Sequence, residues 1–333
     1  MCIRDRLSMA QDKRGCIWVA TEVGLNRFDG NGFTVYKQHN SEIAGDALNT
    51  LLYDEKEDVL WMGGKFGGLC AWEGKSGCFR TYQARNGMKL ENIVHLAKAN
   101  DGGIWITPRH SDPIYFDSRS HRFTSLSDMG IQLDCRSNLC AFADGDLLYV
   151  GHYRGGMSII DLKKKTTCRM LHDPAVPQSL PGHSIYSLYK DRLGHLWVGT
   201  EWGLGLLDSS TGRFTVFRHV QGRTSSLVAD HVYDICETAD GKLWIACDVG
   251  GISILDLSQI TFKHPEEVCF ENLLSAVTGK GLSSSNIRKV LQDSYGNIWI
   301  GNYSCGLDFI SHRPPVFQTV SYTHLTLPTK LEV

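Results

Sequence analysis

One aromatic residue, flanked on both sides by apolar residues, recurs along the chain at nearly constant spacing. Consecutive copies lie 43 to 55 residues apart, a period typical of the four-stranded blades of a β-propeller. The seven aromatic anchors are Trp18, Trp61, Trp105, Tyr149, Trp197, Trp244 and Trp299. A repeat of this length fixes both the size and the number of the structural units, so it constrains the fold more than any other feature of the sequence.

Each copy has the same internal order of four short apolar segments. In the fifth copy, an apolar run ends at Asp191, a turn follows at Gly194, and the next apolar segment contains Trp197. A second glycine-containing turn leads to a third segment, and the fourth segment starts at a Phe. Four short segments joined by tight turns predict one twisted antiparallel sheet. The sequence therefore predicts an all-β fold, a seven-bladed β-propeller with four-stranded antiparallel blades and negligible helix. We expect the aromatic anchors to pack between neighbouring blades.

Composition agrees with this fold and excludes several classes of protein. Glycine accounts for 34 of 333 residues and proline for 9, which favours many tight turns between short strands. The formal net charge of −2 provides no polycationic surface, so we expect no nucleic-acid partner. The sequence contains no run of 18 apolar residues, so no membrane-spanning helix is predicted.

The cysteines form no CxxC pair and match no zinc template, so no metal site is predicted. Most of them fall in apolar strand segments, where a free thiol behaves as a small hydrophobic side chain. If the compartment is oxidising, Cys70–Cys78 and Cys135–Cys140 are the pairs that we expect to form disulfides.

The two ends of the chain are predicted not to come from the gene. One codon choice for residues 1–5 is ATG TGT ATA AGA GAC, and its reverse complement encodes Val-Ser-Tyr-Thr-His, the sequence of residues 320–324. Five codons that match on opposite strands indicate one DNA adapter in inverted orientation. We therefore expect residues 1–6 and 320–333 to be adapter-derived, and residues 7–319 to be the propeller, as an internal piece of a longer protein.

The segment from Asp191 to Thr200 resembles the two-component regulator propeller repeat, whose pattern runs Asp-x-x-Gly-x-(Leu/Ile)-Trp-(Ile/Val)-Gly-Thr. The first and seventh copies match the pattern well, and the resemblance covers essentially residues 7–319. It implies the periplasmic sensor propeller of a hybrid two-component histidine kinase, which detects glycan fragments and signals by phosphorelay. It further implies that the membrane helix, the kinase and a homodimer belong to downstream segments that this chain does not encode.

Three places depart from the repeat pattern. The fourth copy has Tyr149 in place of Trp. The third copy carries Pro108 and Asp112-Pro113 where a glycine turn is expected, so its second hairpin must be rebuilt. Residues 258–282 lengthen the last interval. These departures represent either drift within a repeat or sites of particular function.

No catalytic motif is present. The sequence contains no GxSxG, HExxH, P-loop or dinucleotide-binding fingerprint, so we expect no enzyme activity and no cofactor. Asp12, Asp54, Asp191 and Asp293 occupy one repeat position, where paired carboxylates could perform acid–base chemistry. Their recurrence from blade to blade instead favours turn capping by side-chain acceptors.

A binding site is predicted on the face of the propeller that carries the turns between second and third strands and the loops between blades. The candidate residues are Trp202, Tyr153, Arg154, Tyr303, Arg109, Lys65, Glu201 and Asn302. Aromatic rings offer flat platforms for sugars, and arginine pairs bidentately with carboxylate or sulfate. We expect Trp202, Tyr153 and Tyr303 to stack on a sugar across the channel mouth, while Arg109 and Arg154 orient an acidic group. Further polar residues of this face are Glu22, His110 and Asp248 in the turns. At the starts of first strands are Asn49, Asn92, Asn138, His183, His231 and Asn286, for which turn capping is the alternative role.

Two hypotheses of function follow. The first is a ligand-sensing module that binds an oligosaccharide, and the second is a structural propeller that holds a dimer interface while another domain binds the ligand. A propeller lyase is the third and weakest. A cluster of aromatic and arginine side chains on the channel face would favour the first hypothesis, whereas an exposed apolar patch on the bottom or rim would favour the second.

Overall fold

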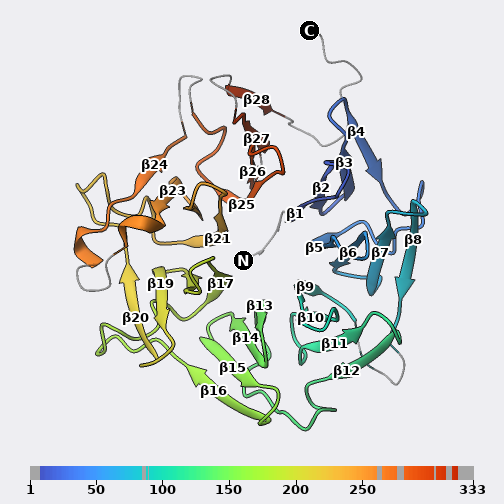
Figure 1. Ribbon diagram of the computed structural model, residues 1–333, viewed down its shortest axis with the longest axis horizontal. Coiled ribbons are helices and arrows are strands. Elements are labelled where there is room, and N and C mark those ends of the chain that lie inside the picture. Colours follow the sequence, from blue (N-terminus) through green and yellow to red (C-terminus); the bar gives the residue numbers. More distant parts are fainter. Residues whose placement is uncertain are drawn as a thin grey trace.

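The structure is a computed structural model of the chain. It describes residues 8–84, 88, 90–260, 265–275, 281–303, 305–312 and 317–321, with residues 265 and 317–321 described by their backbone alone. The described residues form seven four-stranded antiparallel sheets arranged around one axis (Figure 1). Helix is limited to two 3-10 turns, η1 (Leu257–Gln259) and η2 (Pro265–Glu267). The predicted seven-bladed propeller is confirmed.

Every blade is built from four strands that are consecutive in the sequence. Blade one contains β1 (Ser8–Gln11), β2 (Ile17–Thr21), β3 (Gly24–Phe28) and β4 (Phe33–Tyr36). Blade two contains β5 (Leu48–Asp54), β6 (Val59–Gly64), β7 (Leu69–Glu73) and β8 (Cys78–Tyr82). Blade three contains β9 (Ile93–Lys98), β10 (Ile104–Pro108), β11 (Ile114–Asp117) and β12 (Arg122–Ser125). Blade four contains β13 (Asn138–Asp144), β14 (Leu147–His152), β15 (Met157–Asp161) and β16 (Thr166–Met170).

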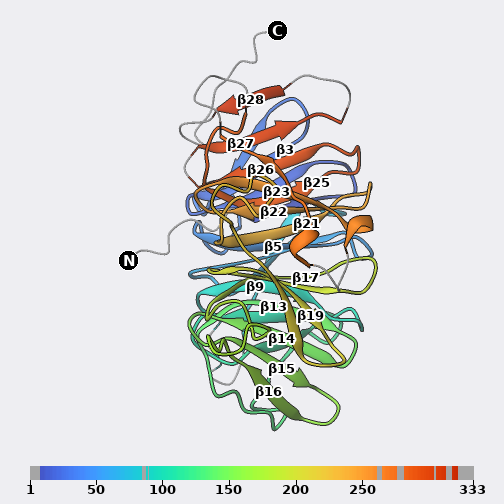
Figure 2. The same ribbon diagram turned by 90° about the vertical axis from the view of Figure 1, so that its left-hand side faces the viewer.

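The remaining three blades follow the same order. Blade five contains β17 (Ile185–Lys190), β18 (Leu196–Thr200), β19 (Gly203–Asp208) and β20 (Arg213–Phe217). Blade six contains β21 (Val232–Glu237), β22 (Lys242–Cys247), β23 (Gly251–Asp256) and β24 (Glu271–Leu273). Blade seven contains β25 (Ile287–Gln292), β26 (Ile298–Asn302), β27 (Gly306–Ile310) and β28 (Phe317–Ser321). The first strand of each blade lies nearest the central axis and the fourth lies at the perimeter (Figure 1), and Figure 2 shows the ring edge-on.

The core is divided into seven apolar clusters, and each cluster lies between two neighbouring blades. The aromatic anchors occupy these clusters as expected. Trp18 and Trp197 are fully buried, Tyr149 fills the equivalent place in blade four, and Trp244 is half-buried. The blades are therefore held together by apolar packing between sheets, and each sheet depends on its neighbours to bury its faces.

The repeated aspartate explains the motif that precedes the tryptophan. In blade five, one oxygen of Asp191 accepts hydrogen bonds from the backbone N–H groups of Leu193 and His195, at 3.0 and 2.8 Å. Its other oxygen accepts from Trp197 Nε1 at 2.8 Å. Blades one and seven repeat this arrangement, with Asp12 on Trp18 at 2.9 Å and Asp293 on Trp299 at 3.0 Å. These aspartates cap turns and fix the buried indole, which supports the capping interpretation over acid–base chemistry.

Blade seven packs directly against blade one and closes the ring. Met9, Ile17 and Val19 of blade one share a buried cluster with Trp299 and Leu307 of blade seven. The Ser294 N–H donates to Gln11 Oε1 at 2.7 Å across the same junction. Neither of these two sheets borrows a strand from the other, so apolar packing joins the two ends of the ring.

The end of blade seven bears on the predicted boundary at residue 319. Strand β28 pairs with β27 as far as Ser321, with Leu307 opposite Val320 and Gly306 opposite Ser321. The regular pairing thus extends two residues past the predicted boundary. Residues 1–6 and 322–333, which we expect to be adapter-derived, lie outside the described residues.

The departures from the repeat have local consequences. In blade three the register shifts between Thr107 and Pro108, and the rebuilt turn is held by Asp112, which accepts from Arg136 Nε at 2.8 Å. In blade six the added residues contain η1 and η2, and the outer strand β24 is short.

Neither of the two disulfides expected for an oxidising compartment is formed, and all the described cysteines are free thiols. Cys70 stands opposite Thr81 rather than Cys78, and the Cys140 thiol lies 3.5 Å from the Ile185 carbonyl of the next blade.

Candidate ligand-binding site at the mouth of the central channel

Six of the innermost strands carry a β-bulge at the same place, next to the start of the strand. A bulge leaves one residue outside the regular ladder and re-aims its side chain. The residues at the bulge are Asn49, Val94, Leu139, Tyr186, Tyr233 and Arg288, and all six line the central channel. Blades two to four thus present small or aliphatic groups, whereas blades five to seven present two tyrosines and an arginine.

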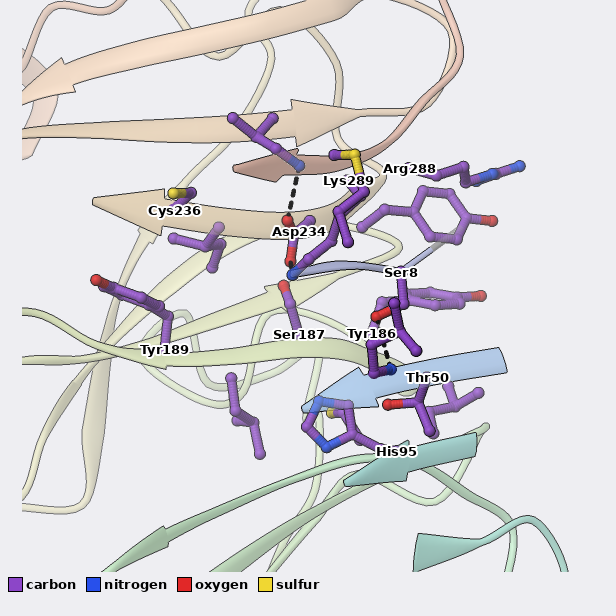
Figure 3. Close-up of a pocket in the computed structure, with 18 of the residues that line it drawn as sticks. Ser8, Thr50, His95, Tyr186, Ser187, Tyr189, Asp234, Cys236, Arg288 and Lys289 are labelled. Atoms are coloured by element: carbon purple, nitrogen blue, oxygen red, sulfur yellow. Dashed lines mark hydrogen bonds and ion pairs between the residues drawn. The ribbon is translucent and has the colours of Figure 1, made fainter. Parts of the chain in front are cut away.

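The channel holds a cavity of about 310 Å³, shown in Figure 3. Arg288 and Tyr186 extend toward one end of it, and Tyr189 and Cys236 lie toward the other (Figure 3). Between the two ends, Lys289 Nζ lies 2.8 Å from Asp234 Oδ1. Burial opposes the charge of this ammonium, but the adjacent carboxylate outweighs burial and raises the pKa of Lys289. The middle of the channel therefore holds a compensated ion pair.

An aromatic cluster forms at the mouth where blades five and six meet. The Tyr186 ring lies 4.7 Å from His231 and 4.8 Å from Tyr233, and His231 stacks on Tyr233 at 4.5 Å between ring centroids. Burial raises the pKa of Tyr186 to about 12, and neighbouring Tyr233 and Glu201 add to this shift. The Tyr186 phenol therefore stays protonated at neutral pH and can donate a hydrogen bond.

Arg288 extends this cluster to blade seven. Its guanidinium lies 3.6 Å from the centroid of the Tyr233 ring and 4.7 Å from that of Tyr303. Its Nη1 atom forms an ion pair with Asp248 Oδ2 at 3.5 Å. Burial, together with the Arg288 charge, lowers the pKa of His231, although Asp248 opposes the shift. Tyrosines, arginine, histidine and aspartate thus converge at one side of the channel mouth.

Arg109 and Tyr153 extend the cluster on the other side, toward blades three and four. The guanidiniums of Arg109 and Arg154 each lie 5.4 Å from the centroid of the Tyr153 ring. Arg109 is only 9% exposed, whereas Arg154 is exposed. Burial lowers the pKa of Arg109, and the charges of Tyr186 and Tyr153 oppose this shift.

Four of the eight predicted site residues make cation–π contacts on this face: Arg109 and Arg154 lie over Tyr153, and Tyr303 lies beside Arg288. Glu201 lies at the edge of the cluster, where its carboxylate accepts from the backbone N–H groups of His183 and Ser184 at 3.0 and 2.7 Å.

The remaining three predicted residues lie apart from the cluster. Asn302 is fully buried and donates to Asp308 Oδ2 at 3.1 Å. Lys65 forms an exposed ion pair with Glu22 at 3.3 Å on blades one and two. Trp202 is 43% exposed and lies against His172 and His183, at 5.2 and 5.0 Å between ring centroids, beside a separate surface pocket walled by the loop 171–184.

Several asparagines of this face hydrogen-bond to a neighbouring blade, rather than cap their own turns as their alternative role predicts. Asn49 donates to the Ile93 carbonyl at 2.9 Å, and Asn286 accepts from the Val249 N–H at 3.1 Å. Asn138 donates to the carbonyls of Pro108 and Ser111, both at 2.8 Å, and so ties blade four to the rebuilt turn of blade three.

Sequence reasoning missed Tyr186, Tyr233 and Arg288. The predicted site residues belong to turns and loops, whereas these three lie inside strands whose bulges turn them toward the channel. The available signal is the second position of the first strand in each repeat, where blades five to seven differ from blades two to four.

Two negative observations apply to the described part of the chain. No group of three or more His, Cys, Asp or Glu side chains is placed to hold a metal ion. Among the same residues, no helix is long and apolar enough to cross a membrane.

The fold defines the class of protein, a seven-bladed β-propeller whose central channel opens on a polar, aromatic face. The family model for the two-component regulator propeller matches residues 179–202, 226–248 and 281–304, which lie in blades five, six and seven. The chain belongs to the two-component regulator propeller family.

Solved structures agree with this assignment. The chain is 32% identical to the extracellular domain described for the hybrid two-component system BT3049 of B. thetaiotaomicron, with a TM-score of 0.79. The match covers 93% of this chain and 40% of that domain, so the chain spans well under half of this relative. No curated protein matches the chain.

Two more distant structures share the fold. PorZ, a surface component of the type-IX secretion system of Porphyromonas gingivalis, is 18% identical with a TM-score of 0.66, and the match covers 90% of this chain and 45% of PorZ. The β-propeller domain of Cps50 (Swd1) from Myceliophteria thermophila is 12% identical with a TM-score of 0.61, and the match covers 83% of this chain and 86% of that domain.

Proposed function

We propose that the chain is the ligand-sensing propeller of an extracytoplasmic two-component sensor, and that it detects glycan fragments at the mouth of its channel. The relationship to an extracellular domain of a hybrid two-component system supports the sensor role and a periplasmic location. The kinase and the phosphorelay would belong to other parts of the longer protein. The propeller itself would bind the ligand and perform no chemistry on it.

The observation that carries the proposal is the one-sided cluster at the channel mouth. His231 stacks on Tyr233, the Tyr186 ring packs against both at a tilt, and Arg288 covers Tyr233. Sugar rings pack their C–H faces on aromatic rings and receive directional hydrogen bonds from charged side chains. The repeat supplies this combination in blades five to seven and places aliphatic residues at the same position in blades three and four, so the scaffold does not require it.

Titration calorimetry with a panel of oligosaccharides tests the proposal. At least one glycan should bind the wild-type chain, and Tyr233→Ala should weaken that binding by about tenfold or more, because a stacking ring and its buried area are lost. Tyr82, a half-buried tyrosine at the perimeter of blade two, provides the matched control. If Tyr82→Ala weakens binding as much as Tyr233→Ala does, the ligand does not bind at the channel mouth.

A second candidate function, an interaction face for another protein or a second copy, has its own supporting observation. Among the described residues, most of the exposed large apolar side chains lie in turns and loops on the channel face. They are Val23, Phe66, Leu171, Val176, Trp202, Val220, Val249 and Leu274, whereas Leu193 and Tyr295 lie on the opposite face. Exposed apolar groups gathered on one face are typical of contact surfaces. Here they surround the channel mouth rather than the bottom of the propeller.

A further inference from the structure

We infer that the ligand of the channel mouth is a sugar carrying one acidic group, which Arg109 holds while Asp248, His231 and Arg288 bind its hydroxyl groups. The inference rests on the proposed function, since it names the class of glycan that the same site selects. It depends on two independent features, a buried cation without a counter-ion and a group of buried polar atoms without hydrogen-bond partners.

Arg109 is a buried charge that lacks a carboxylate partner. Its side chain is only 9% exposed, and no Asp or Glu of the described residues lies within ion-pair distance of it. Its guanidinium donates to the Asn138 carbonyl at 3.3 Å and otherwise faces the Tyr153 ring. Proteins rarely bury a charge without pairing it, because desolvation strongly disfavours the isolated ion. A guanidinium in this position is therefore prepared for an anion that arrives with the ligand.

The backbone around Arg109 is fixed on both sides. The Arg109 N–H donates to the Asn92 carbonyl and the Asn138 N–H donates to the Arg109 carbonyl, both at 2.9 Å. Behind it, the buried Asn138 side chain is held by His152, whose Nδ1 lies 3.1 Å from Asn138 Oδ1. The residue therefore needs little ordering when a ligand binds, which favours affinity.

Arg154 provides the contrast within the same site. It lies as close to the Tyr153 ring as Arg109 does, but its side chain is exposed and water screens its charge. An exposed arginine contributes less to the binding of an anion than a desolvated one does. Of the two arginines predicted from the sequence to orient an acidic group, the geometry assigns this role to Arg109.

The second feature lies on the far side of Tyr186. Asp248 Oδ1 and His231 Nε2 are buried polar atoms that make no hydrogen bond within the described residues, and Arg288 Nη1 makes none apart from its 3.5 Å ion pair with Asp248 Oδ2. The set includes a donor and an acceptor side by side, since Arg288 and Asp248 form an ion pair. Adjacent hydroxyl groups of a sugar both donate and accept, so they match such a pair. A buried polar atom without a partner in the chain is satisfied by an ordered water or by a group of a ligand.

The aromatic rings connect these two features. Tyr186 belongs to blade five, between blades three and four, which carry Arg109 and Tyr153, and blade six, whose stacked His231 and Tyr233 lie 4.7 and 4.8 Å from the Tyr186 ring. A ligand that spans them needs an anionic end and a hydroxylated ring, and a uronic acid or a sulfated sugar has both. Glu201, whose charge raises the pKa of Tyr186, has carboxylate oxygens that already accept two backbone N–H groups.

Matched pairs of sugars test the inference by titration calorimetry. The probes are galacturonate and glucuronate dimers, the neutral galactose and glucose dimers of the same linkage, and the 6-sulfated neutral dimers. We expect the wild-type chain to bind an acidic member at least about tenfold more tightly than its neutral counterpart, and the preference to fall as salt is added. Whether the carboxylate or the sulfate series binds identifies the acidic group.

Two variants locate the acidic group within the site. Arg109→Gln should bring the acidic-to-neutral ratio close to one, while Arg154→Gln should retain most of it. Thermal melts of both variants establish that they fold. Equal binding of acidic and neutral dimers by the wild type, or a full preference in Arg109→Gln, would overturn the inference and leave the proposed function intact if Tyr233→Ala still loses the neutral sugar. Failure of every probe to bind would overturn both.

Discussion

Trp197 and Trp202 lie only five positions apart, yet the structure gives them opposite surroundings. Trp197 is fully buried between blades five and six and donates its indole N–H to Asp191, whereas Trp202 is 43% exposed. Trp197→Ala should destabilise the chain by about 3–5 kcal/mol, because it opens a cavity and leaves a buried acceptor short of one partner. Trp202→Ala should melt at the wild-type temperature. Chemical denaturation of both variants checks the contrast, and equal midpoints would contradict it.

His152 makes the stability of blade four depend on pH. The residue is fully buried, its Nε2 lies 2.8 Å from Ser158 Oγ, and burial lowers its pKa to about 4, with a smaller contribution from Arg169. The unfolded chain, with an ordinary histidine pKa of about 6.5, then binds the proton more readily than the folded chain between pH 6.5 and 4. The contribution of His152 to the free energy of unfolding should be fully present above pH 6.5. It should fall by about 3 kcal/mol as the pH drops from 6.5 to 4.

Denaturation curves between pH 7 and pH 4 measure this loss. His152→Gln removes the titrating group, so its stability should fall less over the same range than that of the wild type. His183, which is exposed, provides the matched control, and His183→Gln should follow the wild-type curve. A His152→Gln variant whose stability falls as steeply as that of the wild type would show that other groups cause the loss.

At the scale of strands, the β-bulge offers a test that the repeat itself provides. The bulge position accepts Val94 in blade three and Leu139 in blade four, so an aliphatic residue is compatible with the fold there. Tyr186→Leu and Arg288→Leu should therefore melt near the wild-type temperature and lose ligand binding by about tenfold or more. Leu139→Ala, at the equivalent place in blade four, should leave binding unchanged. Loss of binding in Leu139→Ala as well would indicate that the bulges shape the channel rather than contact the ligand.

The blades are the part of this structure that the sequence predicts well. The period of the aromatic anchors and the Asp-x-x-Gly turn determine the blades, because each anchor is buried between sheets and each aspartate caps its own turn. These interactions lie within one repeat or between adjacent repeats, so the spacing of the anchors and turns along the sequence is enough to predict them. The same reasoning predicted that Arg109, Tyr153, Arg154 and Tyr303 lie in turns on the channel face, where the structure also has them.

The rest of the site depends on relations between blades that the spacing of the anchors does not contain. Tyr186 and Tyr233 reach the channel only because a bulge turns them, and a bulge appears in the register rather than in the pattern of apolar residues. Trp202 has the composition expected of a sugar platform, but its neighbours His172 and His183 come from the loop before blade five and place it beside a different pocket.

At the scale of the whole molecule, packing between blades one and seven closes the ring. We therefore expect that residues outside these two blades can be removed from the ends without a change in melting temperature. Removal of residues 1–6 and 322–333 should leave the melting temperature unchanged. Removal of residues 320–333 also takes away Val320 and Ser321, which pair with Leu307 and Gly306, so it should lower the melting temperature slightly. Thermal melts of the two truncated chains check this. A loss of several degrees in the shorter truncation would show that the end segments contribute to closing the ring.

The apolar groups around the channel mouth predict how the molecule associates. Phe66 and Val249 are 70% and 72% exposed on opposite sides of the mouth, and burying such side chains stabilises a contact by about 25 cal/mol per Å². If this face is an interface between copies, the double variant Phe66→Ser, Val249→Ser should reduce self-association, while Leu193→Ser and Tyr295→Ser on the opposite face should not. Analytical ultracentrifugation over a concentration series measures the difference. Because these exposed apolar side chains surround the channel mouth, association through them would cover the proposed ligand-binding site. A saturating sugar should therefore also shift the dimerisation constant. A wild-type chain that stays monomeric at all concentrations, with and without sugar, would rule out self-association through the apolar side chains of the channel face. The ligand-sensing role would then be the better-supported function.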